Sequence, residues 1–232
     1  MGADGVRSSV ARWVDAPVDR QGCAASGVVY GYLADLPAEG YEWFYGRQAS
    51  AGFIPTEDGL VCVFAATSAQ RFRELPGTAT DRFAGLLAAA SPAAAERVAH
   101  ARRVGRLRGF GGVPGFLRRA GGPGWSLVGD AGYFKDPLST HGMSDGLRDA
   151  ELLAIAVADT LAGGMPEAAA LAAFQQQRDR LSAALFDATE RVATHDWTED
   201  ELRRRLRELS AAMSDEIDTL LALDRGSAAA VA

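Results

Sequence analysis

The spacing of apolar and polar positions predicts a β-rich segment in the first half of the chain. Between Gly22 and Thr67, apolar and aromatic residues form compact or alternating runs, and turn-forming residues interrupt them at 37–40 and 55–59. Short connections of this kind join antiparallel neighbours. We therefore predict an antiparallel meander of at least three strands, at residues 27–36, 41–55 and 59–66.

Helical spacing dominates the remainder of the chain. Residues 68–101 predict helix with a break at 75–78, and 102–119 predict a further extended segment. A short strand is expected at 126–130. Gly163-Gly164 ends one predicted helix and Pro166 opens the next. The three C-terminal helices are predicted at residues 144–162, 166–194 and 198–222. The first dozen residues predict only a turn and a short basic segment.

Composition narrows the class of protein. The 232 residues are 48 % apolar with a mean hydropathy of −0.04, which is typical of a folded globular protein. The chain has no long apolar run and no secretory leader pattern, so we expect a cytoplasmic protein without a membrane partner. A net charge of −6 argues against nucleic acid as the main partner. Cys23 and Cys62 lie in strand-like runs and are expected to be buried thiols, while His100 and His195 are expected to be solvated.

The most informative stretch is WSLVGDAGYFKDPLSTHGMSDGLRDAELLA, residues 125–154. Asp130 ends the apolar run, where a carboxylate can accept hydrogen bonds from ligand hydroxyl groups. The N–H groups near Gly142 and Met143 open a helix and favour a partly negative ligand atom. An ordinary strand-loop-helix connection, in which Asp130 only makes a turn, explains the same residues, and the loop alone does not separate these readings.

The stretch resembles the second flavin motif of the FAD-dependent aromatic hydroxylases, the single-component flavoprotein monooxygenases related to p-hydroxybenzoate hydroxylase. The residues that carry the resemblance are Gly129, Asp130, Ala131, Pro137, Gly142, Met143, Asp149 and Ala150. It implies that Gly129 and Asp130 bind FAD, with Asp130 on the ribitol chain. It also implies that Pro137 lies beside the isoalloxazine ring and that the Gly142 and Met143 amides face its N1–C2=O edge.

A second segment, GADGVRSSVAR at residues 2–12, resembles the Asp-Gly motif of the same family. The resemblance implies that Asp4 and Gly5 lie beside the cofactor and that Arg7 lies near the pyrophosphate or the NADPH path. A plain N-terminal turn is the alternative. The chain departs from the family pattern at four positions in the longer loop, which bear on the surroundings of the flavin ring: Tyr133, Asp136, Ser139 and Ser144.

One family feature is absent from the sequence. No G-x-G-x-x-G follows a strand and opens a helix, and GFGGVPG at 109–115 has neither the spacing nor a βαβ context. In the family that fingerprint binds the ADP half of FAD. Two explanations stay open: Met1 lies inside a longer reading frame, or the chain is a genuine short form.

The resemblance implies an α/β fold, or α+β if truncated. It would be a partial FAD/NAD(P)-binding fold with an antiparallel-sheet substrate domain and C-terminal helices. The expected parts are a remnant of the FAD-binding domain at 1–15, the substrate domain at 16–120, an FAD-binding segment at 121–165 and helices at 166–232.

The implied function is that of an FAD-dependent monooxygenase-like oxidoreductase, in which NAD(P)H reduces the flavin and oxygen is inserted into a small aromatic substrate. We assign no catalytic acid or base and no metal site. The expected substrate pocket is lined by aromatic residues, for each of which core packing is an equal alternative: Tyr30, Tyr32, Trp43, Tyr45 and Phe53.

Other classes of function stay open at this stage. The chain could be an N-terminally truncated, non-catalytic fragment, or a half-enzyme that needs a partner chain to bind FAD. A homodimer is a further alternative. His141 lies next to the flavin-facing amides in sequence, where contact with the ring or the substrate is expected.

Overall fold

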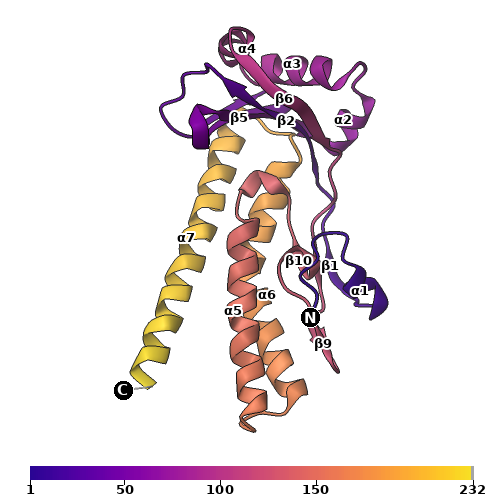
Figure 1. Ribbon diagram of the computed structural model, residues 1–232, viewed down its shortest axis with the longest axis vertical. Helices are drawn as coiled ribbons and strands as arrows, with labels where there is room; N and C mark the ends of the chain where they lie inside the picture. Colours follow the sequence, from indigo (N-terminus) through magenta and orange to yellow (C-terminus); the bar gives the residue numbers. More distant parts are fainter. Residues whose placement is uncertain (231–232) are drawn as a thin grey trace. The chain divides into compact units, whose positions relative to one another are not determined.

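The protein is described here by a computed structural model, which covers the backbone of residues 1–230 and the side chains of residues 1–221 (Figure 1). The helices are α1 (Ser9–Trp13), α2 (Ala69–Glu74), α3 (Ala79–Ala90), α4 (Pro92–Ala99), α5 (Gly142–Leu161), α6 (Glu167–Ala193) and α7 (Glu199–Ala230). The longer strands are β1 (Val18–Gln21), β2 (Ser26–Ala34), β3 (Glu42–Gly46), β4 (Ala49–Pro55), β5 (Val61–Ser68), β6 (Arg102–Phe110) and β7 (Phe116–Arg118). Three two-residue strands follow: β8 (Gly121–Gly122), β9 (Trp125–Ser126) and β10 (Tyr133–Phe134). Helices and antiparallel sheets are thus combined, as the α/β fold class predicted.

The chain divides into two compact units, and each is built from segments that are distant in sequence. The first unit comprises Met1–Cys23, Pro114–Arg191 and Arg203 onward. The second comprises Ala24–Val113 and Val192–Leu202. No helix within residues 1–230 combines the length and the apolar character needed to cross a bilayer.

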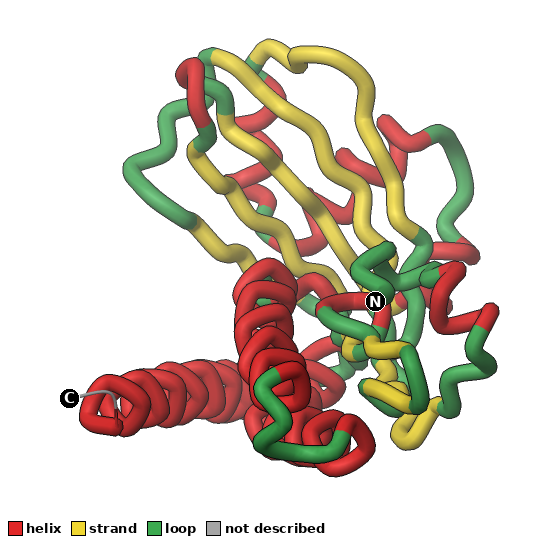
Figure 2. Tube along the Cα trace, turned by 60° about the horizontal axis from the view of Figure 1, so that its bottom comes forward, coloured by secondary structure: helices red, strands yellow, loops and turns green. Residues whose placement is uncertain are grey.

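The second unit contains a five-stranded antiparallel sheet in the order β3-β4-β5-β2-β6 (Figure 2). The predicted pairing of 41–55 with 59–66 is confirmed by β4 and β5. Residues 41–55 form two strands, β3 and β4, joined by a tight turn at Arg47 and Gln48, where a single strand was predicted. The predicted meander is wrong for β2 and β3, which are consecutive in sequence but not paired. Residues 35–41 lead from β2 to β3 at the edge of the sheet, and strands β4 and β5 lie between these two. The largely buried β2 pairs with β5 and β6 instead.

Helices α2, α3 and α4 cover one face of this sheet, as Figure 2 shows. Alternate strand residues point to that face and form the core with the helices, as expected for period-two side chains. Its members include Val29, Leu33, Phe53, Val63, Phe83 and Leu87. Helix α4 starts where predicted, with the Ser91 hydroxyl accepting from the Ala94 N–H and Pro92 in the first turn.

The first unit joins helices α5, α6 and α7 to a small antiparallel sheet, β1-β7-β10, and the β8–β9 ribbon. The predicted strand at 126–130 is shorter than expected. Strand β9 ends at Ser126, Leu127 makes a parallel bridge with Gly2, and the chain then turns through a 3-10 segment, Gly129–Ala131. A second 3-10 segment, Pro137–Ser139, precedes α5.

Several smaller expectations need correction. The N-terminal segment contains a short helix, α1, because the Ser8 hydroxyl caps the Ala11 N–H. Cys23 is exposed and lies after β1, whereas a buried thiol was expected. His195, expected in solvent, is buried because the chain folds it inward between α6 and α7 with φ = 52°.

Candidate functional site

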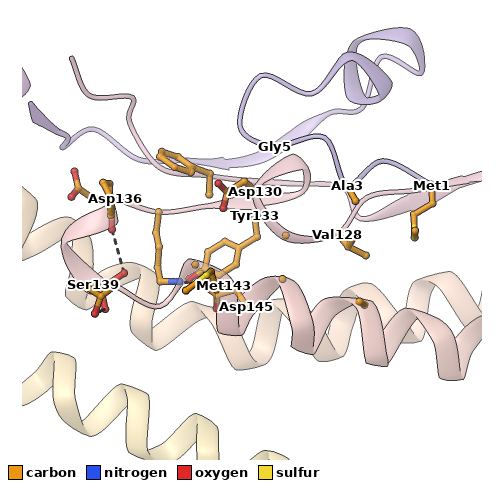
Figure 3. Close-up of a pocket in the computed structure, with 18 residues that line it drawn as sticks. Met1, Ala3, Gly5, Val128, Asp130, Tyr133, Asp136, Ser139, Met143 and Asp145 are labelled. Atoms are coloured by element: carbon orange, nitrogen blue, oxygen red, sulfur yellow. Dashed lines mark hydrogen bonds and ion pairs between the residues drawn. The ribbon is translucent and has the colours of Figure 1, made fainter. Parts of the chain in front are cut away.

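The first unit contains a pocket of about 620 Å³ between the N-terminal residues, the loop after β9 and the start of α5 (Figure 3). It brings together six of the eight residues predicted to bind a cofactor: Gly5, Gly129, Asp130, Pro137, Gly142 and Met143. These residues come from two segments more than 120 positions apart in the sequence. The pocket therefore joins the two motifs into one site.

The other two predicted residues do not line this pocket. The Asp4 carboxylate accepts hydrogen bonds from the Ser8 hydroxyl and the Ser9 N–H, both at 2.6 Å, and so caps α1. The Ser8 hydrogen bond and the backbone N–H groups hold the pKa of Asp4 below its usual range. Arg7 is exposed. The structure therefore gives Asp4 a role in the fold of the N-terminal turn.

Two glycines allow the loop to approach helix α5 closely. Gly129 has φ = 54°, a left-handed conformation that favours glycine, and an added Cβ would lie 3.3 Å from Cα of Gly146. The Gly129 N–H donates a 3.1 Å hydrogen bond to Asp149 Oδ2 on the same helix. The turn that presents Asp130 is thus fixed against α5 by both packing and a hydrogen bond.

Asp130 is the carboxylate left open to the pocket. It is half-buried, and no side-chain or backbone donor within the described part of the chain hydrogen-bonds to it. Burial raises its pKa, and the charge of Lys135 opposes part of that rise. Its Oδ1 atom lies 3.7 Å from the position that a Cβ of Gly142 would take. A hydroxyl-bearing ligand can therefore reach the carboxylate beside the start of α5.

The start of α5 is open as well. His141 occupies the N-cap position but makes no side-chain capping hydrogen bond, and Gly142 and Met143 are exposed. The amides of an uncapped first turn, with the helix dipole behind them, favour a partly negative ligand atom. The open carboxylate of Asp130 and these amides lie on the same pocket wall.

A buried ion network lies beneath this wall, with Arg148 at its centre. The guanidinium is almost completely buried and directs its five N–H groups at acceptors on α5, α6 and α7. The acceptors are Asp145 Oδ1 at 3.2 Å, Asp149 Oδ1 at 3.0 and 2.7 Å, Ser182 Oγ at 3.0 Å, and Glu216 Oε1. Burial alone would lower the Arg148 pKa, but Asp149 and Glu216 raise it, so the cation stays charged.

Lys135 and Asp145 form a second buried pair in the same network, and both line the pocket. The Lys135 ammonium donates to Asp145 Oδ2 and lies 4.7 Å from the ring centre of Tyr133. Burial, and then the nearby charge of Arg148, lowers the pKa of Lys135 to about 7. Burial raises the pKa of the Tyr133 hydroxyl, which therefore stays protonated.

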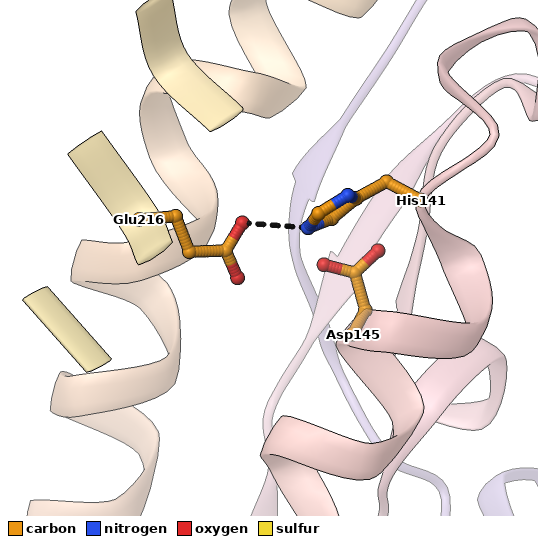
Figure 4. A group of neighbouring side chains, drawn as sticks. All are labelled: His141, Asp145 and Glu216. Carbon is orange, nitrogen blue, oxygen red and sulfur yellow. Dashed lines mark ion pairs between the residues drawn. The ribbon is translucent and has the colours of Figure 1, made fainter. Parts of the chain in front are cut away.

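His141 does not line the pocket, contrary to the expectation of contact with the flavin ring. Its Nε2 atom lies 3.0 Å from Glu216 Oε2, and Asp145 completes a group whose nearest ligand atoms all lie within 4.8 Å of one another (Figure 4). Arg148 contacts both carboxylates and Lys135 contacts one of them, so their charge is already neutralised. We identify the group as part of the ion network and not as a metal site.

The sequence interpretation missed this network. Lys135, Asp145 and Arg148 lie inside the motif, and the i, i+3 spacing of Asp145 and Arg148 was a readable signal. Glu216 gave no such signal, because it lies 68 residues from Arg148 in sequence.

The expected substrate aromatics fall on two faces of the sheet. Tyr30 pairs with Phe64, Phe64 with Gly52, and Gly52 with Trp43, so Tyr30 and Trp43 share the face without helices. By the same alternation Tyr32 and Tyr45 lie there, whereas Phe53 points to the opposite face.

Phe53 is therefore corrected to a core residue, fully buried under α3 because its strand position faces the helices. Tyr30 and Tyr32 instead line a hollow of about 570 Å³ beside β6. Trp43 packs 5.5 Å from Phe64 and Tyr45 6.4 Å from Trp197, measured between ring centres. The open face thus keeps four of the five aromatic residues.

Comparison with known proteins gives a fold but no family. No protein-family profile matches the sequence, and no curated protein matches it. Solved structures do match. The flavin-dependent brominase Bmp2 aligns with a TM-score of 0.73 at 17 % identity over 97 % of this chain. PqsL, a probable FAD-dependent monooxygenase from Pseudomonas aeruginosa, gives 0.68 at 23 % over 92 %. CmlS, a flavin-dependent halogenase, gives 0.68 at 19 % over 88 %.

These similarities define the architecture as a partial flavin-enzyme fold. The chain spans 62 % of the Bmp2 chain, 58 % of PqsL and 41 % of CmlS. At such identities the likeness concerns the fold alone.

Proposed function

We propose that the protein is an FAD-dependent, monooxygenase-like oxidoreductase whose flavin binds in the pocket between the N-terminal residues and the loop before α5. One observation carries the proposal: six residues chosen from two sequence motifs converge on a single pocket. The fold shared with flavin-dependent halogenases and a monooxygenase supports it.

The residues present fit the ribitol and ring portions of FAD. Asp130 offers a half-buried carboxylate without a protein donor in the described residues, which suits a ribitol hydroxyl. The uncapped amides at Gly142 and Met143 suit the electron-rich N1–C2=O edge. Gly5 and Gly129 keep the pocket wall free of side chains, and Pro137 borders it.

Bound FAD would supply the redox and oxygen chemistry, with NAD(P)H as the source of electrons. The chain's own residues would bind, orient and shield the cofactor. Asp149 and Arg148 hold the Gly129 turn so that Asp130 faces the pocket. Tyr133 and Phe134 bring buried aromatic surface to the pocket wall and would keep water from the part of the cofactor that they cover.

For the substrate we propose a small aromatic compound, received by the open sheet face of the second unit. Tyr30 and Tyr32 line a hollow there together with Arg106 and Arg108. Aromatic side chains favour stacking with aromatic ligands, and the arginines favour a ligand that carries an anionic group. Trp43 extends the aromatic surface on the same face.

The proposal is tested by titrating the purified chain with FAD and following flavin fluorescence and the visible spectrum. We expect binding in the micromolar range or tighter, and at least a tenfold loss in Asp130→Ala. Asp159→Ala removes an exposed carboxylate near the other end of α5 and should bind like the parent chain. Equal binding by the parent and Asp130→Ala would contradict the assignment of the pocket.

A second candidate, a half-enzyme that binds FAD only with a partner chain, has its own supporting observation. Helix α5 exposes a set of large apolar residues: Met143, Leu147, Ile155, Val157 and Leu161. Leu147 and Leu161 are 75 % and 83 % exposed, whereas the apolar side chains of a helix normally face the protein core. Absence of FAD binding by the parent chain, together with self-association that Leu147→Glu and Leu161→Glu abolish, would favour this candidate.

A further inference from the structure

Lys135 is the only lysine in the 232-residue sequence, and the other basic side chains, apart from the histidines, are arginines. Surface cations in this protein are therefore guanidinium groups, which stay charged at every physiological pH. The one side-chain amine of the chain is nearly completely buried and lines the pocket.

The groups around Lys135 come from its own loop and from two helices. Asp145 accepts a hydrogen bond from the ammonium. The other charged or titratable groups that face it are Asp130 and Tyr133 in the loop, Arg148 and Asp149 on α5, and Glu216 on α7. Arg148 repels the ammonium and the carboxylates attract it, while burial disfavours its charge.

A series of three polar side chains, Lys135, Asp145 and His141, leads from the pocket towards solvent. The Lys135 ammonium donates a hydrogen bond to the carboxylate of Asp145. The same carboxylate lies within 4.8 Å of the nearest ring nitrogen of His141 (Figure 4). One water molecule can bridge a separation of that size. The His141 side chain is 15 % exposed and is the most exposed of the three.

We propose that Lys135, Asp145 and His141 form a proton path between the pocket and solvent, with Lys135 as the group that exchanges protons inside the pocket. Arg148 and Glu216 act as positioning residues, because their contacts fix the Asp145 carboxylate and the His141 ring. The proposal rests on the proposed function, since the reduction and reoxidation of a bound flavin would take up and release protons in the pocket.

The proton balance of the path is simple. The Lys135 ammonium gives a proton to an acceptor in the pocket and becomes a neutral amine. Asp145, protonated by the His141 imidazolium, passes a proton to that amine and returns to the carboxylate. His141 then takes a proton from a hydronium ion in the solvent, which becomes water. Each group ends in its starting state, and one proton has moved inward; the reverse sequence moves one outward.

Lysine suits this task, whereas arginine would not. A proton-transfer group works best when its pKa lies near the working pH. Burial and Arg148 bring the pKa of Lys135 to about 7, whereas an arginine in its place could not be deprotonated.

The test uses the full chain labelled with ¹⁵N at the lysine side chain, which gives one ammonium signal because only Lys135 contributes. We expect the signal to titrate with a midpoint near 7, against about 10.4 for a free lysine. We also expect the exchange of its protons with water to slow at least threefold in His141→Gln, with little change in the midpoint. His100→Gln, at an exposed histidine outside the pocket, should leave the titration midpoint and the exchange rate of Lys135 unchanged.

A midpoint near 10, or equal exchange rates in the parent and His141→Gln, would overturn the path. His141→Asn provides a second variant if His141→Gln does not fold, as judged by circular dichroism. A parallel measurement follows proton uptake with an indicator dye while chain-bound FAD is reduced by dithionite. We expect slower uptake in Lys135→Met, and uptake at the parent rate would likewise overturn the path.

The two measurements separate this inference from the proposed function. Failure of the chain to bind FAD would reject the proposed function, while the lysine titration and exchange still decide on the path. Tight FAD binding with a lysine midpoint near 10 would reject the path and leave the proposed function standing.

Discussion

The backbone N–H of Gly129 donates a 3.1 Å hydrogen bond to the carboxylate of Asp149, twenty residues further along the chain. Asp149 is at the same time held by two N–H groups of Arg148. One buried carboxylate therefore connects the turn that presents Asp130 to the ion network between α5, α6 and α7.

Asp149→Ala should destabilise the protein strongly. The change leaves the Gly129 N–H without its acceptor and removes a counter-charge of the buried Arg148. Breaking a buried ion pair costs about 3–5 kcal/mol, and we expect a loss of that size in urea unfolding. Asp187→Ala, which removes one partner of the half-exposed Arg20–Asp187 pair, should cost less than about 1 kcal/mol. Similar losses in the two variants would contradict the central role of Asp149.

Two glycine substitutions at the same contact should have opposite signs. Gly129→Ala forces alanine into φ = 54° and brings its Cβ to 3.3 Å from Gly146, so we expect a loss of at least about 1–2 kcal/mol. Gly146→Ala places a Cβ at an ordinary 3.9 Å from Gly129 and improves helix propensity inside α5. It should be neutral or stabilise by up to about 1 kcal/mol. Thermal unfolding of both variants checks the pair, and a destabilised Gly146→Ala would show that the contact is tighter than described.

Acid should destabilise the second unit through His195. Burial lowers the pKa of His195 from 6.5 to about 4, and its Nε2 lies 3.0 Å from Ser26 Oγ. Between pH 6.5 and pH 4 the unfolded chain binds a proton that the folded chain does not, so stability falls as pH falls through this window, by at most about 1.4 kcal/mol per pH unit.

The measurement is the urea midpoint at several pH values for the parent chain and for His195→Asn, a residue that tolerates the left-handed backbone at this position. The variant should lose less stability on acidification than the parent. His100→Asn, at an exposed site, should keep the parent profile. Parallel profiles for the parent and His195→Asn would exclude His195 as the source of the acid sensitivity.

Local sequence signals predicted the elements of this fold well. Strand β5 and the helices α3 to α6 lie close to their predicted ranges, because spacing and capping residues act over a few positions. The pairing of β2 with β5 and β6 was not predictable in the same way. It depends on which strand buries most surface, a property of the assembled sheet.

The candidate site shows the same division. The residues of the loop before α5 could be chosen from the sequence because they lie within one short motif, and they line one pocket. Asp4 does not line the pocket, because its carboxylate accepts hydrogen bonds from Ser8 and Ser9 within the N-terminal turn. Glu216 could not be found, since only the packing of α7 brings it to Arg148.

Because Lys135 is the only lysine, limited proteolysis can report how often the loop before α5 unfolds. A protease that cuts only after lysine has one target in the whole sequence, the Lys135–Asp136 peptide bond, and both residues are buried. Cleavage must therefore wait for local unfolding, and its rate measures the population of chains in which this loop has come away. Any molecule that binds in the pocket and stabilises the folded loop slows cleavage of the Lys135–Asp136 bond.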